Sequence, residues 1–391
     1  MNIPIVVVAY NRVNSLRRLL TSIARAEYPT EPVELIISID KGDNEDVIRF
    51  AREFPWPHGP KTLRCQPENL GLKRHILSCG DLSQEYDGII MLEDDLYVSR
   101  DFYRYALEAA AFVRGDDRIG GVALYNHRLS QLTEKVFEPV CDGYDNWYFQ
   151  YAASWGQMWT REQWAGFKRW YLQNTDYDFE NSEKIPDHIR QWGRHSWLKY
   201  NIAYLIETDR FFLYPRVARS TNFCDAGVNE GTQDNQFQVP LLLGGRTGPC
   251  RFSALEESRA VYDAFMENRW LTGELKDGDV CVDLYGAKTY FEGKTCLLTS
   301  ARLEGAELLE TYGRVLRPHE MNVIEKIPGE ELRLYRLREG AKKMPADRAA
   351  KKNDVRYFVR GISYPYKKVI LTLFWEESVE KVRRRLKRLF R

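Results

Sequence analysis

The sequence lacks the features that mark disulfide-rich, zinc-binding or membrane-spanning proteins. Its seven cysteines are widely spaced and form no Cys-x-x-Cys pair, which argues against a disulfide framework and a structural zinc site. No run of ~18 apolar residues occurs, so we expect no membrane-spanning helix. The first residues contain neither a basic segment nor a cleavage site, and we therefore expect no signal peptide and a cytoplasmic location.

Neither sign of charge predominates, because 57 lysines and arginines face 56 aspartates and glutamates for a net charge of +1. Nucleic-acid-binding proteins are usually clearly basic, so we expect no nucleic acid as a partner. The glycine-rich signatures of dinucleotide sites and of P-loops are also absent, which disfavours both kinds of phosphate site. The length suggests roughly two or three domains.

Short apolar runs alternate with helical patterns along the first third of the chain. The runs lie at residues 3–8, 33–39, 88–92 and 119–124. After the first run, apolar residues recur at helical spacing from Leu16 to Ala24, with Asn14 as the expected N-cap. A second helix is expected from about Asp101. This alternation predicts an α/β fold with a mostly parallel sheet flanked by helices.

The later part of the chain changes in character. Turn residues at 244–249 indicate a boundary, so we expect a first domain over residues 1–245. A smaller accessory α/β region is expected over residues 250–340, with 256–270 helical and 296–299 a strand. Residues 341–391 are predicted as a linker followed by a basic amphipathic helix.

Three consecutive acids, Glu93-Asp94-Asp95, directly follow the apolar run at residues 88–92. In an open parallel sheet, ligands bind beyond the carboxyl ends of the strands. Adjacent carboxylates repel one another there, and a divalent cation would relieve the repulsion. Hard oxygen ligands suit Mg²⁺ or Mn²⁺. The alternative is an acidic turn that caps the helix near Asp101.

Two further strand ends are expected at the same edge. Asp40 ends the run at residues 33–39, and Ala9-Tyr10-Asn11-Arg12 follows the first run. A nucleotide sugar needs a ring that stacks on the base, a carboxylate that accepts from the base or ribose, and a metal that neutralises the diphosphate. The edge therefore suits a nucleotide sugar, although Tyr10 and Asp40 taken singly are equally typical of turns.

Together these segments resemble the glycosyltransferases of the A-type fold. The resemblance lies in Ala9-Tyr10-Asn11-Arg12, in Asp40 and in Glu93-Asp94-Asp95-Leu96, with Asp101-Phe102-Tyr103 behind them. The Glu-Asp-Asp-Leu segment is similar to that of bacterial family 2-like enzymes and of the Golgi N-acetylglucosaminyltransferase that acts on alpha-mannosides. The resemblance covers roughly residues 1–245. It implies the nucleotide-diphospho-sugar transferase fold, a nucleotide-sugar donor, Mn²⁺ or Mg²⁺, and inversion at the anomeric carbon.

The resemblance also implies roles for individual residues. Asp95 matches the metal-binding acid, and Glu93 and Asp94 match positions near the ribose and sugar of the donor. Asp40 matches the acid that faces the base. Lys73 or Arg74 would reach the diphosphate, with a solvent-facing helix start as the alternative.

An inverting transfer needs a general base that takes the proton of the acceptor hydroxyl. The Golgi enzyme has paired aspartates beside a tryptophan, whereas residues 192–197 contain no acid here. The candidates are Asp187, His195 and Asp225. We choose Asp187, for which helix capping is the alternative role.

Trp155-Gly156-Gln157 resembles the acceptor-side loop of these enzymes, in which the tryptophan stacks on a sugar; a core tryptophan is the alternative. In the tail, Val379, Val382, Leu386 and Leu389 recur at helical spacing opposite seven basic residues. Such a helix is typical of peripheral binding to an anionic membrane, here the inner face, where polyisoprenyl-linked acceptors lie. A solvated helix or a nucleic-acid patch is the alternative.

The sequence therefore predicts a metal-dependent transferase that moves a hexosyl or N-acetylhexosaminyl group from a nucleotide sugar to a saccharide or lipid-linked acceptor. Bacterial surface-polysaccharide synthesis is the expected setting. The alternatives are a sugar-nucleotide nucleotidyltransferase and a non-catalytic scaffold that binds nucleotide sugars. The first would show a glycine-rich basic loop after the first strand, where Ala9-Tyr10-Asn11-Arg12 stands instead.

Overall fold

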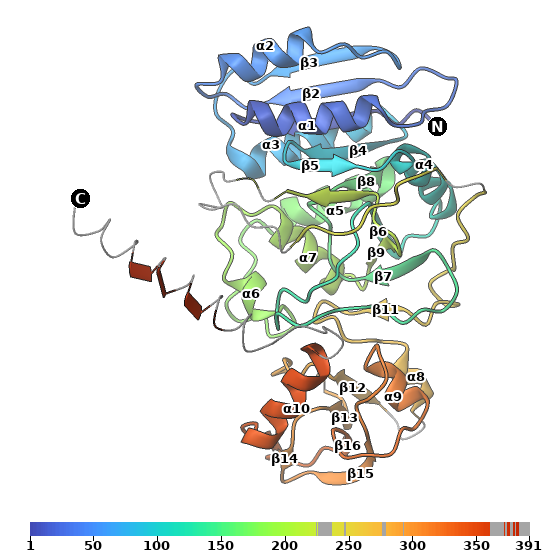
Figure 1. The fold of residues 1–391 in the computed structure, drawn as a ribbon, viewed down its shortest axis with the longest axis vertical. Coiled ribbons are helices and arrows are strands. Elements are labelled where there is room, and N and C mark those ends of the chain that lie inside the picture. Colours follow the sequence, from blue (N-terminus) through green and yellow to red (C-terminus); the bar gives the residue numbers. More distant parts are fainter. Residues whose placement is uncertain are drawn as a thin grey trace. The chain divides into compact units, whose positions relative to one another are not determined.

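The computed structural model describes residues 1–223, 225, 237–245, 248–275, 279–291 and 293–359, and residues 371, 374, 375, 378, 379, 381 and 382. The chain divides into two compact units, Met1–Pro345 and Ala346–Arg391. The first contains almost all of the described strands and helices (Figure 1). No helix among the described residues is both long and apolar enough to cross a membrane.

A nine-stranded sheet forms the centre of the first unit, in the order β11-β7-β9-β6-β8-β4-β1-β2-β3. The strands are β1 (Ile5–Ala9), β2 (Leu35–Ile39), β3 (Lys61–Cys65), β4 (Gly88–Glu93), β6 (Ile119–Ala123), β7 (Asn146–Phe149), β8 (Gln157–Thr160), β9 (Phe211–Pro215) and β11 (Val261–Tyr262). Neighbours run parallel except that β8 is antiparallel to β4 and β6, and β7 is antiparallel to β9. The predicted mostly parallel α/β sheet is thus confirmed.

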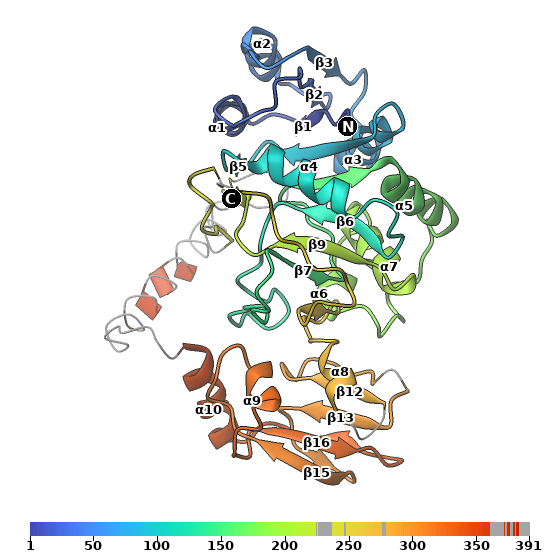
Figure 2. The ribbon, with the colours of Figure 1, turned by 90° about the vertical axis from the view of Figure 1, so that its right-hand side faces the viewer.

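Helices cover both faces of this sheet (Figure 2). They are α1 (Val13–Ala24), α2 (Glu45–Glu53), α3 (Gly71–Gly80), the 3₁₀ turn η1 (Asp81–Gln84), α4 (Phe102–Phe112), α5 (Arg161–Gln173), α6 (Asp187–Arg190) and α7 (Leu198–Glu207). On one face α1, α2 and α4 pack on alternate strand residues such as Ile5 and Val7. On the other, Trp164 of α5 contacts Trp159 of β8 at 4.8 Å between ring centroids. The alternation of side chains along each strand separates these two cores.

Two local predictions are wrong. The N-cap of α1 is Arg12 rather than Asn14, because the helix begins at Val13 and its first bond runs from the Leu16 amide to the Arg12 carbonyl (3.0 Å). Residues 256–270 do not form a helix. Instead β11 pairs with β7, and the amide of Gln150 donates to the carbonyl of Tyr262 (3.0 Å). The open edge of the sheet overrides the local helical pattern there.

Smaller strand groups complete the first unit. One four-stranded sheet has the order β12 (Val280–Asp283), β13 (Cys296–Thr299), β16 (Leu332–Arg336) and β15 (Glu307–Tyr312). The helices α8 (Leu271–Glu274) and α9 (Glu320–Ile324) contribute to its separate core. Two further sheets have two strands each. One pairs β5 (Leu96–Val98) with β10 (Ser220–Asn222), and the other pairs β14 (Leu303–Glu304) with β17 (Lys342–Lys343).

The segment expected as a linker contains β17 and most of α10 (Arg348–Val359), a helix of the second unit. The predicted basic helix over residues 376–391 lies outside the described residues, apart from 378, 379, 381 and 382. The basic residues of this helix that lie between positions 383 and 391 are outside the described residues.

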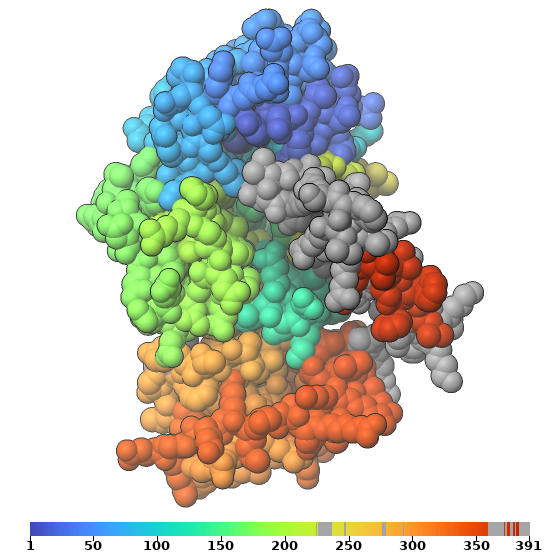
Figure 3. All heavy atoms as spheres, turned by 90° about the vertical axis from the view of Figure 1, so that its left-hand side faces the viewer, coloured from blue at the N-terminus to red at the C-terminus, as the bar shows by residue number. Residues whose placement is uncertain are grey.

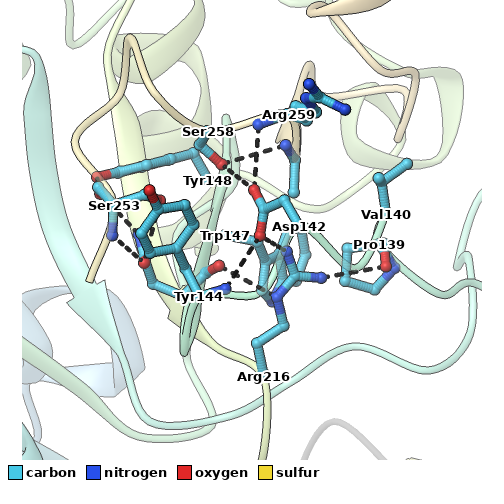
Figure 4. Close-up of polar contacts among 12 residues, drawn as sticks. Pro139, Val140, Asp142, Tyr144, Trp147, Tyr148, Arg216, Ser253, Ser258 and Arg259 are labelled. Atoms are coloured by element: carbon cyan, nitrogen blue, oxygen red, sulfur yellow. Dashed lines mark hydrogen bonds and ion pairs between the residues drawn. The ribbon is translucent and has the colours of Figure 1, made fainter. Parts of the chain in front are cut away.

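A buried ion pair fastens the ends of β7 and β9 (Figure 4). Arg216 donates to Asp142 at 2.7 Å, and these side chains are 13% and 3% exposed. The other oxygen of Asp142 accepts from the Ser258 hydroxyl (3.0 Å) and the Arg259 amide (3.1 Å). Arg216 also donates to the carbonyls of Asn146 and Pro139. Because both charges have several partners, the network holds this edge of the sheet in place.

Candidate functional site at the carboxyl edge of the sheet

The carboxyl ends of β1, β2 and β4 lie side by side, since β1 pairs in parallel with both of the others. Val8 is opposite Glu93, and Ala9 is opposite Ile39. The segment Ala9–Arg12, Asp40 and the three acids therefore meet at one edge of the sheet, as the sequence indicates. The sheet topology, and not any single motif, creates this meeting point.

Arg12 is the positive partner of the acidic segment. Its guanidinium forms an ion pair with Asp94 and a second one with Asp95, at 3.2 Å to Oδ2. Burial raises the pKa of Asp94 to about 6, although Arg12 acts in the opposite direction. Burial, followed by the charges of Asp95 and Asp94, raises the pKa of Glu93 to about 8. The acids thus form a crowded cluster that favours a cation.

The acidic cluster suits a divalent cation only when a bound ligand supplies further oxygen atoms. Among the described residues, no three histidines, cysteines, aspartates or glutamates are grouped as metal ligands. Mg²⁺ and its relatives commonly bind through one or two carboxylates and complete their coordination with phosphate oxygens and water. Asp95, half-buried at the end of β4, fits that pattern when a diphosphate supplies the other oxygens.

Asp225 joins the same group from a distant part of the chain. Its carboxylate forms an ion pair with Arg18 and accepts from the Ser15 hydroxyl (2.7 Å). Arg12 donates to its backbone carbonyl at 3.2 Å. Burial alone would raise the pKa of Asp225, but the hydrogen bonds from Arg18 and Ser15 outweigh it, so the pKa lies below its usual value.

Sequence reasoning missed Ser15 and Arg18. The only local signal is their spacing: Arg12, Ser15 and Arg18 recur every three residues at the start of α1. Residues three apart lie near one another on a helix. Nothing in the sequence indicates that Asp225, 207 residues after Arg18, completes the group. The guanidinium of Arg18 also lies over the ring of Phe223, with 3.8 Å between its Cζ and the ring centroid.

Asp40 holds the start of α3. Its carboxylate accepts from the amides of Leu70 (2.8 Å) and Gly71 (2.9 Å), and from that of Lys41 (2.9 Å). Tyr10 packs against Gly42 so closely that a Cβ there would lie 2.5 Å from its ring. The neighbouring Asn11 is exposed. Tyr10 and Asp40 are thus firmly positioned beside the acids.

Lys73 and Arg74 have partners elsewhere. Lys73 donates to the carbonyl of Arg194 (2.8 Å), and burial lowers its pKa. Arg74 pairs with Glu68 at 2.9 Å on the surface. Neither side chain contacts the three acids in the part of the chain that the structure describes.

The predicted acceptor-side residues lie at the start of β8. The half-buried Trp155 contacts the rings of Tyr125 (4.7 Å) and Phe237 (5.0 Å). Gly156 has φ +99°, and the Ser220 hydroxyl donates to the carbonyl of Trp155 (2.5 Å). Gln157 is fully buried, and its Oε1 has no hydrogen-bond partner among the described residues.

The three candidate bases differ in their surroundings. Asp187 begins α6, as expected, and its side chain is 61% exposed and pairs with Arg190. His195 is exposed in the loop before α7. Asp225 is committed to Arg18 and Ser15, which leaves its carboxylate poorly suited to take a proton.

Fold and site define an α/β protein with a buried acidic group beyond the carboxyl ends of parallel strands. No protein-family model matches the chain. Solved structures that resemble it include TarS from S. aureus, at 14% identity and a TM-score of 0.32, over 56% of this chain and 36% of that one. This chain therefore spans about a third of that protein.

Residues 1–349 of S. aureus TarS in complex with UDP-GlcNAc match at 12% identity and a TM-score of 0.32, over 56% of this chain and 58% of that one. The mannosyltransferase PcManGT from Pyrobaculum calidifontis, in complex with GDP-Man and Mn²⁺, matches at 16% identity and a TM-score of 0.30, over 41% and 45%. All three matches have identities of 16% or less and TM-scores of 0.32 or less, so the function of this chain rests on its own residues.

Proposed function

We propose that this chain is a metal-dependent, inverting glycosyltransferase of the A-type fold. The observation that carries the proposal is the acidic group Glu93-Asp94-Asp95, which lies at the carboxyl end of β4 beside the ends of β1 and β2 and already pairs with the cation of Arg12. The donor is a nucleotide sugar that transfers a hexosyl or N-acetylhexosaminyl group. The acceptor is a saccharide or a polyisoprenyl-linked sugar of surface-polysaccharide synthesis.

In this proposal the residues at the carboxyl edge of the sheet each contact a different part of the nucleotide-sugar donor. Tyr10 and Asp40 contact the base and ribose, and Glu93 and Asp94 lie near the ribose and sugar. Asp95 would hold Mn²⁺ or Mg²⁺, which would supply positive charge to offset that of the diphosphate. Arg12 is close enough to the acids to donate to the same diphosphate, and Lys73 and Arg74 would need new rotamers to do so.

On the acceptor side, Trp155 stacks on a sugar and Asp187 takes the proton of the attacking hydroxyl. Exposure supports this assignment of the base: both carboxylates pair with an arginine, but the side chain of Asp187 is 61% exposed and that of Asp225 only 18%. The tail attaches the protein to the cytoplasmic face of an anionic membrane. Its described residues Leu371, Phe374 and Trp375 are exposed and apolar, which suits insertion among lipid headgroups.

Thermal unfolding with a panel of nucleotide sugars, with and without Mn²⁺, tests the proposal. A donor at ~100 times its Kd stabilises the folded protein by about 2.7 kcal/mol. Asp95→Ala should abolish the Mn²⁺-dependent shift, and the control Asp46→Ala, which removes an exposed carboxylate from α2, should keep it. If no nucleotide sugar stabilises the wild type, the proposed donor site is wrong.

Donor hydrolysis in the presence of Mn²⁺ separates an enzyme from a scaffold. A catalytic protein releases the nucleoside diphosphate slowly even without acceptor, because water replaces the acceptor hydroxyl. Stabilisation by the donor without any hydrolysis or transfer would favour the non-catalytic alternative.

A further inference from the structure

A small cavity lies outside the donor edge, between the hairpin after β6 and α6. His127, Ser130 and Gln131 line it from the hairpin, and His188 lines it from α6. The remaining walls are mainly aromatic and aliphatic. The space open to the centre of a water molecule is about 10 Å³, so it accommodates about one oxygen-sized group. In Figure 3 the teal hairpin and the light-green segment around α6 are adjacent on one face of the protein.

His188 is the first of two histidines that line this cavity. Both of its ring nitrogens are buried, and neither has a partner among the described residues. Burial lowers the pKa of His188 to about 4, against the opposing charge of Asp187. The ring is therefore neutral near pH 7 and carries one N–H donor and one bare nitrogen. Leaving such groups unpaired is costly, which indicates that something else fills the cavity.

His127 is the second. It is 3% exposed and lies within 6 Å of five aromatic rings, among them those of Tyr151 (5.6 Å) and Trp155 (5.9 Å). Burial lowers the pKa of His127 to about 3, so this ring is neutral as well. Its contact with Trp155 connects the cavity to the acceptor side of the proposed site.

The lining selects the chemistry of its occupant. It contains no lysine or arginine, which disfavours a phosphate or carboxylate. Two histidines are too few for a closed metal site, and no group of three ligands exists among the described residues. Gln131 and Ser130 already accept from Tyr151 (2.8 Å) and from the amide of Thr133 (3.3 Å). A neutral hydroxyl oxygen fits this space, because it can donate to one ring nitrogen and accept from another.

We propose that this cavity is a subsite for one neutral hydroxyl group of a saccharide acceptor, bound through the ring nitrogens of His127 and His188. The identity of the ligand rests on the proposed transferase function, whereas the existence of a hydroxyl site does not. Both histidines act by binding and have no part in the proton transfer. The subsite lets the protein distinguish an acceptor that carries this hydroxyl from one that lacks it.

Histidine ring NMR on the full-length protein tests the proposal directly. The six histidines are assigned by single substitutions, and the probes are methyl glycosides of glucose, mannose and N-acetylglucosamine. At least one glycoside should shift the His127 and His188 signals saturably. Tetrahydropyran, which has the ring without hydroxyls, and inorganic phosphate should not. The signal of His58, already bonded to the Ala24 carbonyl at 2.9 Å, is the internal reference and should stay in place.

Two variants separate binding from structure. His188→Phe keeps a ring of similar size without its nitrogens and should weaken glycoside binding about tenfold, the effect of losing one or two hydrogen bonds. His188→Gln, which keeps a donor and an acceptor, should recover part of the loss. Shifts that tetrahydropyran reproduces, an unchanged affinity in His188→Phe, or no shift with any glycoside would each overturn the subsite and leave water as its occupant.

The donor experiment distinguishes the two proposals. If Mn²⁺ and a nucleotide sugar stabilise the protein but no glycoside shifts the histidines, the subsite fails and the proposed function stands. If glycosides shift the histidines and no donor stabilises the protein, the hydroxyl site stands and the proposed function fails.

Discussion

Asp142→Ala removes the acid from the buried ion pair that fastens β7 and β9 (Figure 4). The substitution leaves Arg216, with a side chain only 13% exposed, without its carboxylate. It also leaves the Ser258 hydroxyl and the Arg259 amide without their acceptor. Removing one partner of a buried pair typically costs ~3–5 kcal/mol. Because Arg216 keeps the carbonyls of Asn146 and Pro139, we expect the lower end, about 3 kcal/mol.

The free energy of unfolding, measured by urea titration and tryptophan fluorescence, gives this loss. The control is Asp46→Ala, which breaks an exposed pair with Arg49 whose side chains are 73% and 66% exposed. Exposed pairs contribute ~0–1 kcal/mol, so this variant should unfold almost as the wild type does.

A double variant checks the cause of the loss. Adding Arg216→Met to Asp142→Ala removes the uncompensated charge, so the double variant should be more stable than the sum of the two single losses predicts. If Asp142→Ala loses no more than Asp46→Ala, or if the two losses simply add, the ion pair does not hold this edge of the sheet.

Four further results are expected. Asp187→Asn should lower turnover by ~10² or more with donor affinity unchanged, and loss in His195→Ala or Asp225→Asn instead would reassign the base. Deletion of residues 364–391 should abolish sedimentation with anionic vesicles at low salt while the donor-induced thermal shift persists, and equal sedimentation of both forms would refute the membrane role. Gly156→Ala should lower the free energy of unfolding by ~1–3 kcal/mol, because its Cβ would lie 2.5 Å from Ser220 Oγ, whereas Gly273→Ala, with open space, should change it little. Burial lowers the pKa of His127, so its contribution to the free energy of unfolding is fully present above pH ~6.5 and is lost as the pH falls, by up to ~1.4 kcal/mol per pH unit. In urea titrations at pH 7 and ~5.5, His127→Gln should therefore show a smaller loss of stability between the two pH values than the wild type.

Local sequence patterns were enough to place the central strands and the acids beyond them. The runs that became β1, β2, β4 and β6 are short, apolar and rich in β-branched residues, a composition that favours buried strands in almost any context. Parallel pairing then requires their carboxyl ends to share an edge. These two facts put Glu93-Asp94-Asp95 at the same edge as Asp40 and Tyr10, and the strand order β4-β1-β2 then makes them neighbours.

Packing over long sequence distances decided the rest. Residues 256–270 have a helical pattern, yet long-range contacts fix a different structure there: β11 pairs with β7, and Tyr262 is fully buried. Arg18 meets Asp225, and His127 meets the same cavity as His188, across separations that no local pattern encodes. Such contacts depend on how whole elements pack, because each side chain is directed by the element that carries it, and only the folded chain brings those elements together.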